Sequence, residues 1–575
     1  MKIKNTELVN ISKKNIIYIS PEYGYSSKIN NYAGGLGILA GDFLKEASDQ
    51  NVSITAFGLF YREGYFIQSF DDEFNQLSGI DNIDEKMLDF KNILDNGEIK
   101  IFSIRLNGSI IKFKVRQTNI KNISLYLIDT NVKDNLSFEN VTDMLYTSSR
   151  YTRLLQEILL GQGAIKILEF LDITIDILHI NEGHAAFAFL ERVNQLADKI
   201  NNFNQALQII KKSNIFTTHT PIIHGNEEFD IRLLKEILTN SDLLRHIRFN
   251  RFIELGATLE NTNFSMTALS IRLSKIHNTV SKLHNKVAQR IWSNTFKDIE
   301  FANVTNGVYL KDWMPEQFTP FLMQDGTQKQ SNIINIKHAL KNKALSNLIQ
   351  HNFYNKSQSL LSLYQNVDIP NHSFIIGFAR RFAPYKRTEL LFSDIDNLIS
   401  FFDRNNNVIL FISGKAHPAD IEGQHIIKNI LNDIKKHKLQ ENIIFIENYN
   451  IDIAKILFSI TDIWLNNPIR GLEACGTSGM KASLNASINL SILDGWWDEA
   501  YDSKIGFKIG DICVNDLSNI ELANQILLDI EEVLRIYNNS NAWNELIQNA
   551  FRKVSNDFTT ARMLKEYLNL YQATI

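Results

Sequence analysis

The sequence predicts an α/β protein built from parallel sheets that are covered by helices. Short apolar runs alternate with longer helix-like segments along the whole chain, a pattern typical of strand–helix–strand units. Almost every apolar run ends in a polar and distinctive tail. The 575 residues also exceed what a single hydrophobic core supports, so we expect at least two domains.

The expected strands are short and fall into two groups along the chain. Those of the first half cover residues 16–20, 175–180, 214–218 and 301–305, and those of the second half cover residues 374–377, 408–412, 443–446 and 463–465. Helices are expected between them, for example over residues 151–171 and 420–437. In such sheets the ligand lies beyond the carboxyl ends of the strands, so the polar tails are the candidate functional segments.

The composition excludes several classes of function. The content of 44% hydrophobic and 22% charged residues is that of a globular protein, and a net charge of −4 gives no reason to expect nucleic acid or an anionic membrane as partner. Two cysteines, Cys475 and Cys513, make neither a disulfide framework nor a metal cluster. No segment has the roughly 18 uninterrupted apolar residues of a membrane span, and the first residues lack the apolar core of a signal peptide. We therefore expect a cytoplasmic protein without a metal.

The most informative segment covers residues 473–481 and follows the apolar run 462–466. It places a carboxylate, Glu473, a set of Gly, Thr and Ser residues and a lysine, Lys481, within nine residues. Small residues at the start of a helix can hold a phosphate with their backbone N–H groups. A lysine beyond them can form an imine with an aldehyde, and pyridoxal phosphate carries both groups. A glycine-rich turn followed by a surface lysine is the alternative interpretation of this segment alone.

Several other tails have the chemistry of ligand sites. Residues 31–37 form a glycine turn before an expected helix at 38–47, which suits a second anion but also a plain strand–helix turn. The tails at residues 181–184, 217–220 and 305–307 carry neutral hydrogen-bonding groups suited to hydroxyls. For the histidines in them, His184 and His219, a structural role remains an alternative.

A concentrated set of cations follows the expected strand at 374–377. Residues 380–387 contain four cations and no acid, and the first acid is Glu389. A solvated charged face usually interleaves acids with its cations, so this set favours an anionic ligand. Further polar tails lie at residues 414–417 and 447–449.

Taken together, these motifs resemble the α-glucan (glycogen/starch/maltodextrin) phosphorylases, in their compact bacterial branch. The matching segments occur in the same order over nearly 470 residues: 33–37, 181–184, 216–221, 304–307, 377–381, 385–387, 414–418, 447–449, 466–468, 473–481 and 493–498. The resemblance implies two Rossmann-like domains facing an interdomain cleft, the GT-B type of glycosyltransferase fold. It also implies transfer of the terminal glucosyl unit of an α-1,4-glucan to inorganic phosphate, giving glucose 1-phosphate with retained configuration.

The resemblance further implies pyridoxal 5′-phosphate as cofactor and a set of residues that bind it. Lys481 matches the lysine that holds the cofactor, and Thr477 and Ser478 match its phosphate cradle. Arg380 matches a further contact to that phosphate, and Tyr449 matches a tyrosine near the cofactor ring. Gly35 is also expected among the cofactor-binding residues, and its backbone N–H is expected to help bind the substrate phosphate.

The substrate-binding residues are implied in the same way. Arg381 and Lys386 match residues that bind the substrate phosphate. His219 and Asn306 match positions at the 6-hydroxyl of the sugar and at the transition state, and His184 belongs to the hydroxyl-binding set. The remaining sugar contacts are expected from Glu473, Ala474, Cys475 and Gly476. We expect the catalytic residues to be Lys481, Arg381, Lys386, His219 and Glu473.

Domain boundaries and regulation are expected as follows. An N-terminal domain with helical insertions should cover residues 1–315, a helical connection 316–370, a cofactor-binding domain 371–557, and a final helix packing back on the first domain 558–575. Cys475 stands where the long enzymes of the family have serine, and the chain is some 200 residues shorter than they are. Because the chain is shorter, we expect no allosteric regulation of the kind found in the long enzymes. The resemblance is compatible with a homodimer.

Two other functions compete with the phosphorylase. A nucleotide-sugar glucosyltransferase similar to glycogen synthase would share the architecture and the glycine turn, but it needs no cofactor lysine at Lys481. A catalytically inactive glucan-binding protein would be expected to have lost a cation or the lysine, whereas Arg381, Lys386 and Lys481 are all present.

Overall fold

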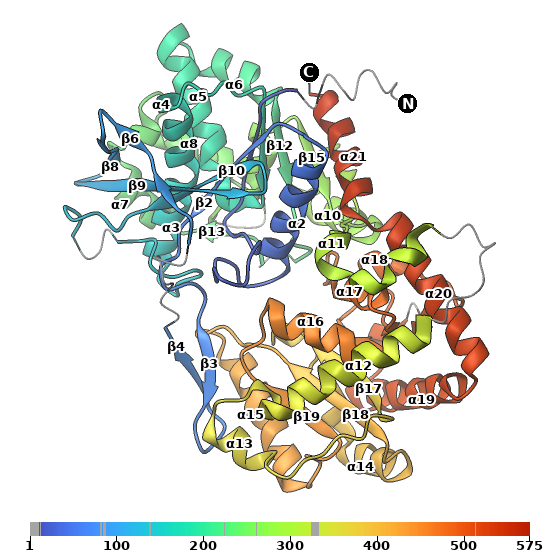
Figure 1. The fold of residues 1–575 in the computed structure, drawn as a ribbon. Helices are drawn as coiled ribbons and strands as arrows, with labels where there is room; N and C mark the ends of the chain where they lie inside the picture. Colours follow the sequence, from blue (N-terminus) through green and yellow to red (C-terminus); the bar gives the residue numbers. More distant parts are fainter. Residues whose placement is uncertain are drawn as a thin grey trace. The chain divides into compact units, whose positions relative to one another are not determined.

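The computed structural model divides the chain into two compact units. The first unit contains residues 1–65, 80–305 and 560–575, and the second contains residues 66–79 and 306–559. The structure describes residues 11, 13–80, 83, 88–136, 140–222, 225–259, 262–323, 333–511 and 513–574. Figure 1 shows the elements of both units.

The first unit is built on a ten-stranded sheet in the order β16-β15-β12-β11-β1-β2-β10-β9-β5, with β8 paired to β9. Its strands are β1 (Ile16–Ile19), β2 (Ile54–Leu59), β5 (Lys91–Asn92), β8 (Phe102–Leu106), β9 (Ser109–Ile120), β10 (Ile123–Asp129), β11 (Ile177–Asn181), β12 (Asn214–Thr217), β15 (Ile276–Thr279) and β16 (Ala302–Asn303). The pairs from β16 to β10 are parallel, and β9 runs antiparallel to β10. Two short antiparallel pairs also belong to this unit: the hairpin of β6 (Leu94–Asp95) with β7 (Glu98–Ile99), and β13 (Glu228–Phe229) with β14 (Phe264–Ser265).

Helices cover this sheet, and the last helix of the chain belongs to its core. They are α2 (Gly35–Asp49), α3 (Arg150–Ile158), α4 (Ala164–Phe170), α5 (Phe187–Ile200), α6 (Phe203–Lys211), α7 (Ile231–Leu238), α8 (Phe249–Gly256), α9 (Met266–Leu273), α10 (Lys282–Trp292) and α21 (Thr560–Gln572). Helix α21 lies beside α2 (Figure 1), and its Tyr567 packs on Phe43 in one hydrophobic cluster. The buried His179 in β11 contacts Tyr571 at 2.8 Å, which ties this helix to the centre of the sheet.

The second unit contains a six-stranded, wholly parallel sheet in the order β19-β18-β17-β20-β21-β22. Its strands are β17 (Phe374–Ala379), β18 (Val408–Ser413), β19 (Ile443–Ile446), β20 (Ile463–Asn466), β21 (Ile488–Ser491) and β22 (Gly506–Lys508). The helices are α11 (Leu310–Trp313), α12 (Ile333–Gln350), α13 (Gln358–Leu363), α14 (Ile395–Arg404), α15 (Ile421–Lys436), α16 (Ile451–Ile460), α17 (Ser478–Leu484), α18 (Trp496–Ala500), α19 (Asn519–Tyr537) and α20 (Ser540–Asp557). Strands β17 to β20 are almost entirely buried, as expected for a parallel sheet covered on both faces.

A hairpin from the first eighty residues belongs to the second unit. It consists of β3 (Ile67–Phe70) and β4 (Gln76–Gly79). The amide of its buried Gln68 donates to the backbone carbonyl of Gly414 at 3.0 Å, and Lys415 donates to the carbonyl of Phe66 at 2.6 Å. The tail at residues 414–417 therefore holds this hairpin.

The structure confirms the predicted fold class at the level of a mixed α/β protein with large parallel sheets. All eight expected strands are present, and the helix expected over residues 420–437 is α15. The helix expected over residues 151–171 is α3 followed by a π-helical turn, Leu159–Gly163, and α4. The sequence interpretation did not include the antiparallel strands β8 and β9, and the arrangement of two facing Rossmann-like domains remains a prediction.

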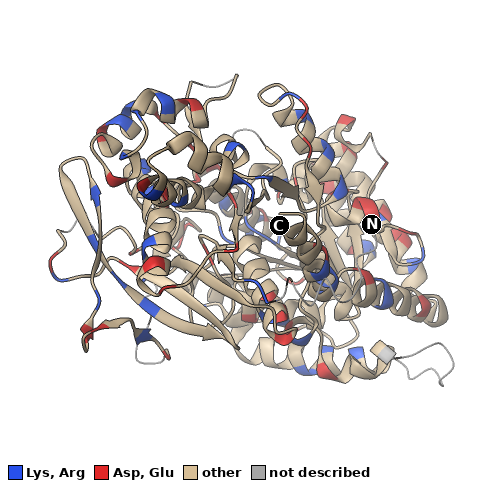
Figure 2. Cartoon of the chain, turned by 90° about the horizontal axis from the view of Figure 1, so that it is seen from above, with Lys and Arg blue, Asp and Glu red and all other residues tan. Residues whose placement is uncertain are grey.

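Two surface properties complete the description. No helix within the described residues is both long and apolar enough to cross a membrane. Basic and acidic residues are interspersed along the helices (Figure 2), in line with the small net charge of −4.

Candidate active site

The predicted site residues of the second unit gather where its strand order reverses. The chain runs outward from β17 through β18 to β19, and then returns to the other side of β17 as β20. The carboxyl ends of β17 and β20 therefore diverge at a topological switch point, the usual place for a ligand in such sheets. Arg380 follows β17 directly, and the segment 473–481 follows β20.

Lys481 lies in α17 and is buried beneath an aromatic ring. Its Nζ atom lies 3.8 Å from the centroid of the Trp313 ring, at the end of α11. Asn485 connects the two helices, because its amide donates to the carbonyls of Trp313 at 2.7 Å and of Lys481 at 2.8 Å. The lysine is thus held in a low-dielectric site, where an amine is suited to bind an aldehyde.

The start of α17 has the features of a phosphate cradle. Thr477 is its N-cap, and no side chain caps the first turn. The Ser478 hydroxyl accepts a hydrogen bond from the Trp464 indole at 3.2 Å, and its own hydrogen remains a donor. Backbone N–H groups at such a terminus favour an anion.

The buried Arg380 and Glu473 and the half-buried Lys386 form a charged cluster beside this helix. The Arg380 guanidinium donates to the Glu473 carboxylate, and the Lys386 ammonium lies 3.1 Å from the same oxygen. Burial disfavours the ionised form of Glu473, but the two cations outweigh it and hold its pKa at about 2. The carboxylate is therefore ionised throughout the neutral pH range.

Two further N–H donors of Arg380 are buried without a partner. Its Nε and Nη1 atoms make no hydrogen bond to any residue in the described part of the chain. Buried donors of a charged group are costly unless they are satisfied, so this guanidinium is prepared for an additional anion. The Arg380 carbonyl meets Gly414 so closely that a Cβ there would lie 1.9 Å away, and hence only glycine fits.

The other cations of the 380–387 set have different environments. The Arg381 side chain is exposed. The buried Arg387 donates to the carbonyls of Asn467 at 3.1 Å and Pro468 at 2.7 Å, which ties the loop after β17 to the loop after β20. The structure thus gives Arg387 a structural role. Tyr449 is half-buried in the loop after β19, next to the buried Glu447.

Asp494 holds the loop that carries Glu473 by accepting backbone hydrogen bonds. The Asp494 carboxylate accepts the backbone N–H groups of Gly471 at 3.0 Å, Glu473 at 3.1 Å and Gly495 at 2.8 Å. Burial, followed by the nearby charge of Glu473, raises the pKa of Asp494 to about 7. A Cβ on Gly476 would lie 2.0 Å from the Glu473 carboxylate oxygen, so any other residue at position 476 would displace this carboxylate.

The expected sugar-binding residues of the second unit adjoin this loop. Asn306 donates its amide to the Cys475 carbonyl at 3.2 Å, and both residues are buried. Ala474 is also buried, whereas Gly476 is half-buried. The structure thus brings Asn306, Cys475 and Glu473 together with Lys386 and Arg380.

The first unit has a switch point of its own, between β1 and β11. The chain leaves β1 toward β2 on one side and continues later from β11 on the other. Gly35 begins α2 after β1, and a Cβ at this position would meet no atom within 4 Å. However, the Glu22 carboxylate already accepts the N–H groups of Ala33 at 2.6 Å and Gly34 at 3.3 Å. Only N–H groups from Gly35 onward can therefore serve an anionic ligand.

His219 follows β12 and is uncharged near neutral pH. Burial, followed by the nearby His284 and His179, lowers its pKa to about 3. Its ring contacts Asn181, the first residue of the tail at 181–184, at 2.6 Å. The structure therefore brings the tails of β11 and β12 together.

His184 lies in a separate charged cluster of the first unit. Its Nε2 atom lies 3.6 Å from Glu227, and ligand atoms of His184, Glu157 and Glu227 lie within 4.8 Å of one another, close enough to hold a metal ion. Arg153 and Arg150 each approach Glu227 at 2.5 Å, so guanidinium groups already supply positive charge to this cluster. Burial, followed by the nearby Glu227, raises the pKa of Glu157 well above its usual range.

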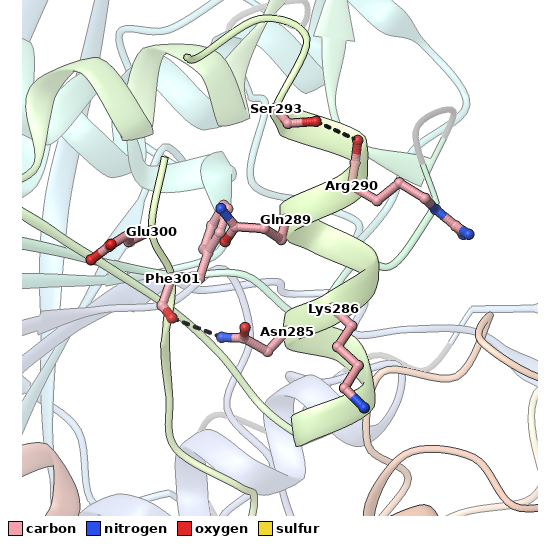
Figure 3. Close-up of a pocket in the computed structure, with 7 residues that line it drawn as sticks. All are labelled: Asn285, Lys286, Gln289, Arg290, Ser293, Glu300 and Phe301. Carbon is pink, nitrogen blue, oxygen red and sulfur yellow. Dashed lines mark hydrogen bonds between the residues drawn. The ribbon is translucent and has the colours of Figure 1, made fainter. Parts of the chain in front are cut away.

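A hollow of about 610 Å³ on the first unit contains none of the predicted residues. It is lined by Asn285, Lys286, Gln289, Arg290, Ser293, Glu300 and Phe301. Figure 3 shows Lys286 and Arg290 pointing away from Phe301, while Asn285 donates to the Phe301 carbonyl at 2.8 Å. The hollow is open, and the Asn285 amide within it is already engaged with the backbone.

Comparison with known proteins assigns the family. The model of the carbohydrate phosphorylases matches residues 144–503. A maltodextrin phosphorylase of Thermococcus litoralis is 33% identical over 97% of this chain and 70% of its own length. A glycogen phosphorylase of Aquifex aeolicus is 32% identical over 98% of this chain and 87% of its own, and one of Mycobacterium tuberculosis is 30% identical over 97% and 70%. The chain belongs to the carbohydrate phosphorylase family.

Two residues of the candidate site were not identified from the sequence. Trp313 covers Lys481, and Asp494 holds the Glu473 loop. Asp494 lies in the matched segment 493–498, so that segment was a signal for it, although nothing local indicated its three N–H donors. For Trp313 the only signal was an aromatic residue shortly after the tail at 305–307.

Proposed function

We propose that the protein is an α-1,4-glucan phosphorylase, which transfers the terminal glucosyl unit of glycogen or maltodextrin to inorganic phosphate. The products are glucose 1-phosphate, with retained configuration, and a glucan shortened by one unit. The observation that carries the proposal is the joint presence of a buried lysine and an anion-binding cluster at the switch point of a family member.

The residues present fit pyridoxal 5′-phosphate as the cofactor. Lys481 would hold its aldehyde carbon, and Tyr449 would lie near its ring. The N–H groups at Thr477 and Ser478 would bind its phosphate, together with the two buried donors of Arg380 that lack a partner within the described residues.

The charges of the cluster suit two phosphate groups. Arg380 and Lys386 of the cluster and the exposed Arg381 beside them carry three positive charges and Glu473 one negative charge, which leaves two positive charges. When bound, pyridoxal phosphate supplies a second phosphate, and like charges that close raise a pKa, so that the pair retains a proton near neutral pH. Arg381 and Lys386 would bind the substrate phosphate and offset the remaining repulsion.

The reaction then needs only proton transfer and displacement at the sugar. The substrate phosphate passes a proton to the glycosidic oxygen, the C–O bond to the departing glucan breaks, and the phosphate attacks the oxocarbenium-like carbon from the same face. Glu473, Ala474, Cys475 and Gly476 would hold the glucose hydroxyls. Asn306, His184 and the uncharged His219 would complete the polar contacts, with His219 stabilising the developing positive charge.

The proposal includes the architecture and setting expected for such an enzyme. We propose that the two units are Rossmann-like domains of the GT-B type and face a cleft in which Gly35 and His219 meet the groups of the second unit. We also propose a cytoplasmic enzyme whose partners are glucan, phosphate and glucose 1-phosphate.

The test is release of glucose 1-phosphate from maltodextrin in the presence of inorganic phosphate and pyridoxal phosphate. We expect turnover by the natural protein and none by Lys481→Ala, because the cofactor then has no anchor. Lys436→Ala removes an exposed lysine of α15 and should retain the natural rate. Glucan elongation from UDP- or ADP-glucose without phosphorolysis would contradict the proposal, and so would glucan binding without any turnover.

A further inference from the structure

The His219 ring ends a chain of hydrogen bonds that runs through the core of the first unit. Its Nε2 atom lies 2.6 Å from Asn181 Oδ1, and Asn181 Nδ2 lies 3.2 Å from the Ser20 hydroxyl. That hydroxyl in turn lies 3.0 Å from the backbone carbonyl of Glu22. Ser20 and Asn181 are both buried, at the carboxyl ends of the adjacent strands β1 and β11.

The last member of this chain fixes the direction of every bond in it. A backbone carbonyl can only accept, so the Ser20 hydroxyl must donate to Glu22 and accept from Asn181. The Asn181 amide nitrogen therefore faces Ser20, and its oxygen faces the histidine. An amide oxygen only accepts, so His219 carries its proton on Nε2.

The backbone of His219 is held as firmly as its ring. One oxygen of the Glu182 carboxylate accepts the His219 N–H at 2.5 Å and the Thr220 hydroxyl at 2.9 Å, and the other accepts the Gly183 N–H at 3.2 Å. Glu182 itself has φ +76° and ψ +161°, a region that non-glycine residues rarely adopt. Such strain persists only where the surroundings enforce it, and it is common next to functional residues.

The second ring nitrogen of His219 is consequently a fixed acceptor. With Nε2 protonated and the ring uncharged, Nδ1 carries a lone pair and no hydrogen. Burial keeps the ring uncharged by lowering its pKa to about 3, and His284 and His179 act in the same direction. The Glu182 carboxylate binds the His219 backbone N–H.

We propose that Ser20 and Asn181 are positioning residues that lock His219 in the Nε2–H form and so present Nδ1 as an acceptor to a hydroxyl of the terminal sugar. The proposal rests on the proposed function and on the family resemblance, which matches His219 to a position at the 6-hydroxyl of the glucosyl unit. It makes the chain Glu22–Ser20–Asn181–His219 a determinant of specificity, because only a sugar that carries a hydrogen-bond donor there satisfies Nδ1.

The kinetic test compares glucose 1-phosphate with 6-deoxyglucose 1-phosphate in glucan elongation. Asn181→Leu keeps the size of the side chain but removes the acceptor, so the ring can place its proton on Nδ1. We expect the ratio of the two kcat/KM values to fall about tenfold, through loss of activity on glucose 1-phosphate only. Asn181→Asp retains an acceptor for Nε2–H, and at pH 8 it should keep the ratio of the natural protein.

A matched control separates this effect from general damage to the core. Asn194 in α5 is also fully buried, and its amide donates to the Leu243 carbonyl at 2.8 Å. Asn194→Leu should therefore lower stability without changing the ratio. An unchanged ratio in Asn181→Leu, or an equal change in Asn194→Leu, would overturn the proposal.

A second measurement needs no substrate or cofactor. In protein labelled with [15N]histidine, the ring signals of His219 are assigned by their loss in His219→Gln. We expect Nε2 to be protonated in the natural protein and a mixture of both forms in Asn181→Leu. A natural protein protonated on Nδ1 would refute the inference, whereas an enzyme inactive on glucose 1-phosphate with the expected ring signals would refute only the proposed function.

Discussion

Glu473 lies between Arg380 and Lys386, the two cations that phosphate groups would also contact in the proposed function. Its carboxylate contacts both Arg380 and Lys386, and these contacts keep it ionised. An anion that enters the cluster must therefore compete with a resident carboxylate. In the proposed function, this competition would help to set the affinity for phosphate.

Replacement of Glu473 by Gln should tighten the binding of inorganic phosphate. The substitution keeps the shape of the side chain but frees one unit of positive charge at Arg380 and Lys386. We expect the Kd for phosphate, measured by calorimetry on the protein without cofactor, to fall about tenfold. Glu441→Gln removes an exposed acid of the same unit and should leave this Kd unchanged. Equal or weaker binding by Glu473→Gln would show that the carboxylate does not compete with phosphate.

The sequence predicted which residues carry functional groups better than it predicted which residues they contact. The four cations at 380–387 were recognised as a set, but Arg380 and Lys386 face Glu473 while Arg387 binds the backbone of the loop after β20. That division depends on where a loop distant in sequence lies. For the same reason, the three N–H groups gathered by Asp494 could not be anticipated from the sequence.

At the element scale, helix α12 is fixed to the second unit by two buried lysines. Lys337 donates to the carbonyls of Phe458 at 3.0 Å and Asn485 at 2.8 Å, and Lys341 pairs with Asp462 at 2.5 Å. Asn485 is the C-cap of α17, the helix that carries Lys481. The ammonium of Lys337 therefore also stabilises the end of the candidate cofactor helix.

Stability should depend on pH through Lys337. Burial lowers its pKa to about 7, while Asp462 acts in the opposite direction and Lys341 in the same direction. Because the ordinary pKa is 10.5, the unfolded chain binds more protons than the folded one between these values. The free energy of unfolding should therefore gain a contribution from this group as pH rises from about 7 to about 10.5.

The measurement is urea unfolding of the natural protein and of Lys337→Met across that pH range. The free energy of unfolding of the natural protein minus that of the variant should increase with pH, by a few kcal/mol at most. Lys436→Met removes an exposed lysine and serves as the control, for which the difference in the free energy of unfolding should not change with pH. A flat difference for Lys337→Met would mean that the pKa of this lysine is not lowered.

Strands with uninterrupted apolar runs were predictable, and others were not. The core strands β17, β18 and β19 are wholly buried and appear in the sequence as continuous apolar runs. Strand β9 instead alternates between buried and partly exposed residues, a period-two signal that could have identified it. The membership of the β3–β4 hairpin in the second unit follows from contacts such as Gln68 to Gly414, which no local pattern encodes.

At the scale of the whole molecule, each unit places its candidate residues at a switch point of its own parallel sheet. In the first unit the tails of β1 and β11 bring Ser20 and Asn181 together, and His219 joins them from β12. In the second unit the tails of β17 and β20 bring Arg380 and Glu473 together. The sequence predicted this location because the carboxyl ends of parallel strands share one edge.

Whether Lys481 holds the cofactor is tested by mass mapping of the protein after incubation with pyridoxal phosphate and reduction with borohydride. We expect a single pyridoxyl adduct on Lys481, because this buried amine lies beneath Trp313 and in the helix whose start forms the candidate phosphate cradle. The adduct should be absent in Lys481→Ala and present in Lys436→Ala. An unmodified Lys481 in the presence of excess pyridoxal phosphate would contradict the proposed role of Lys481 and the phosphorylase mechanism.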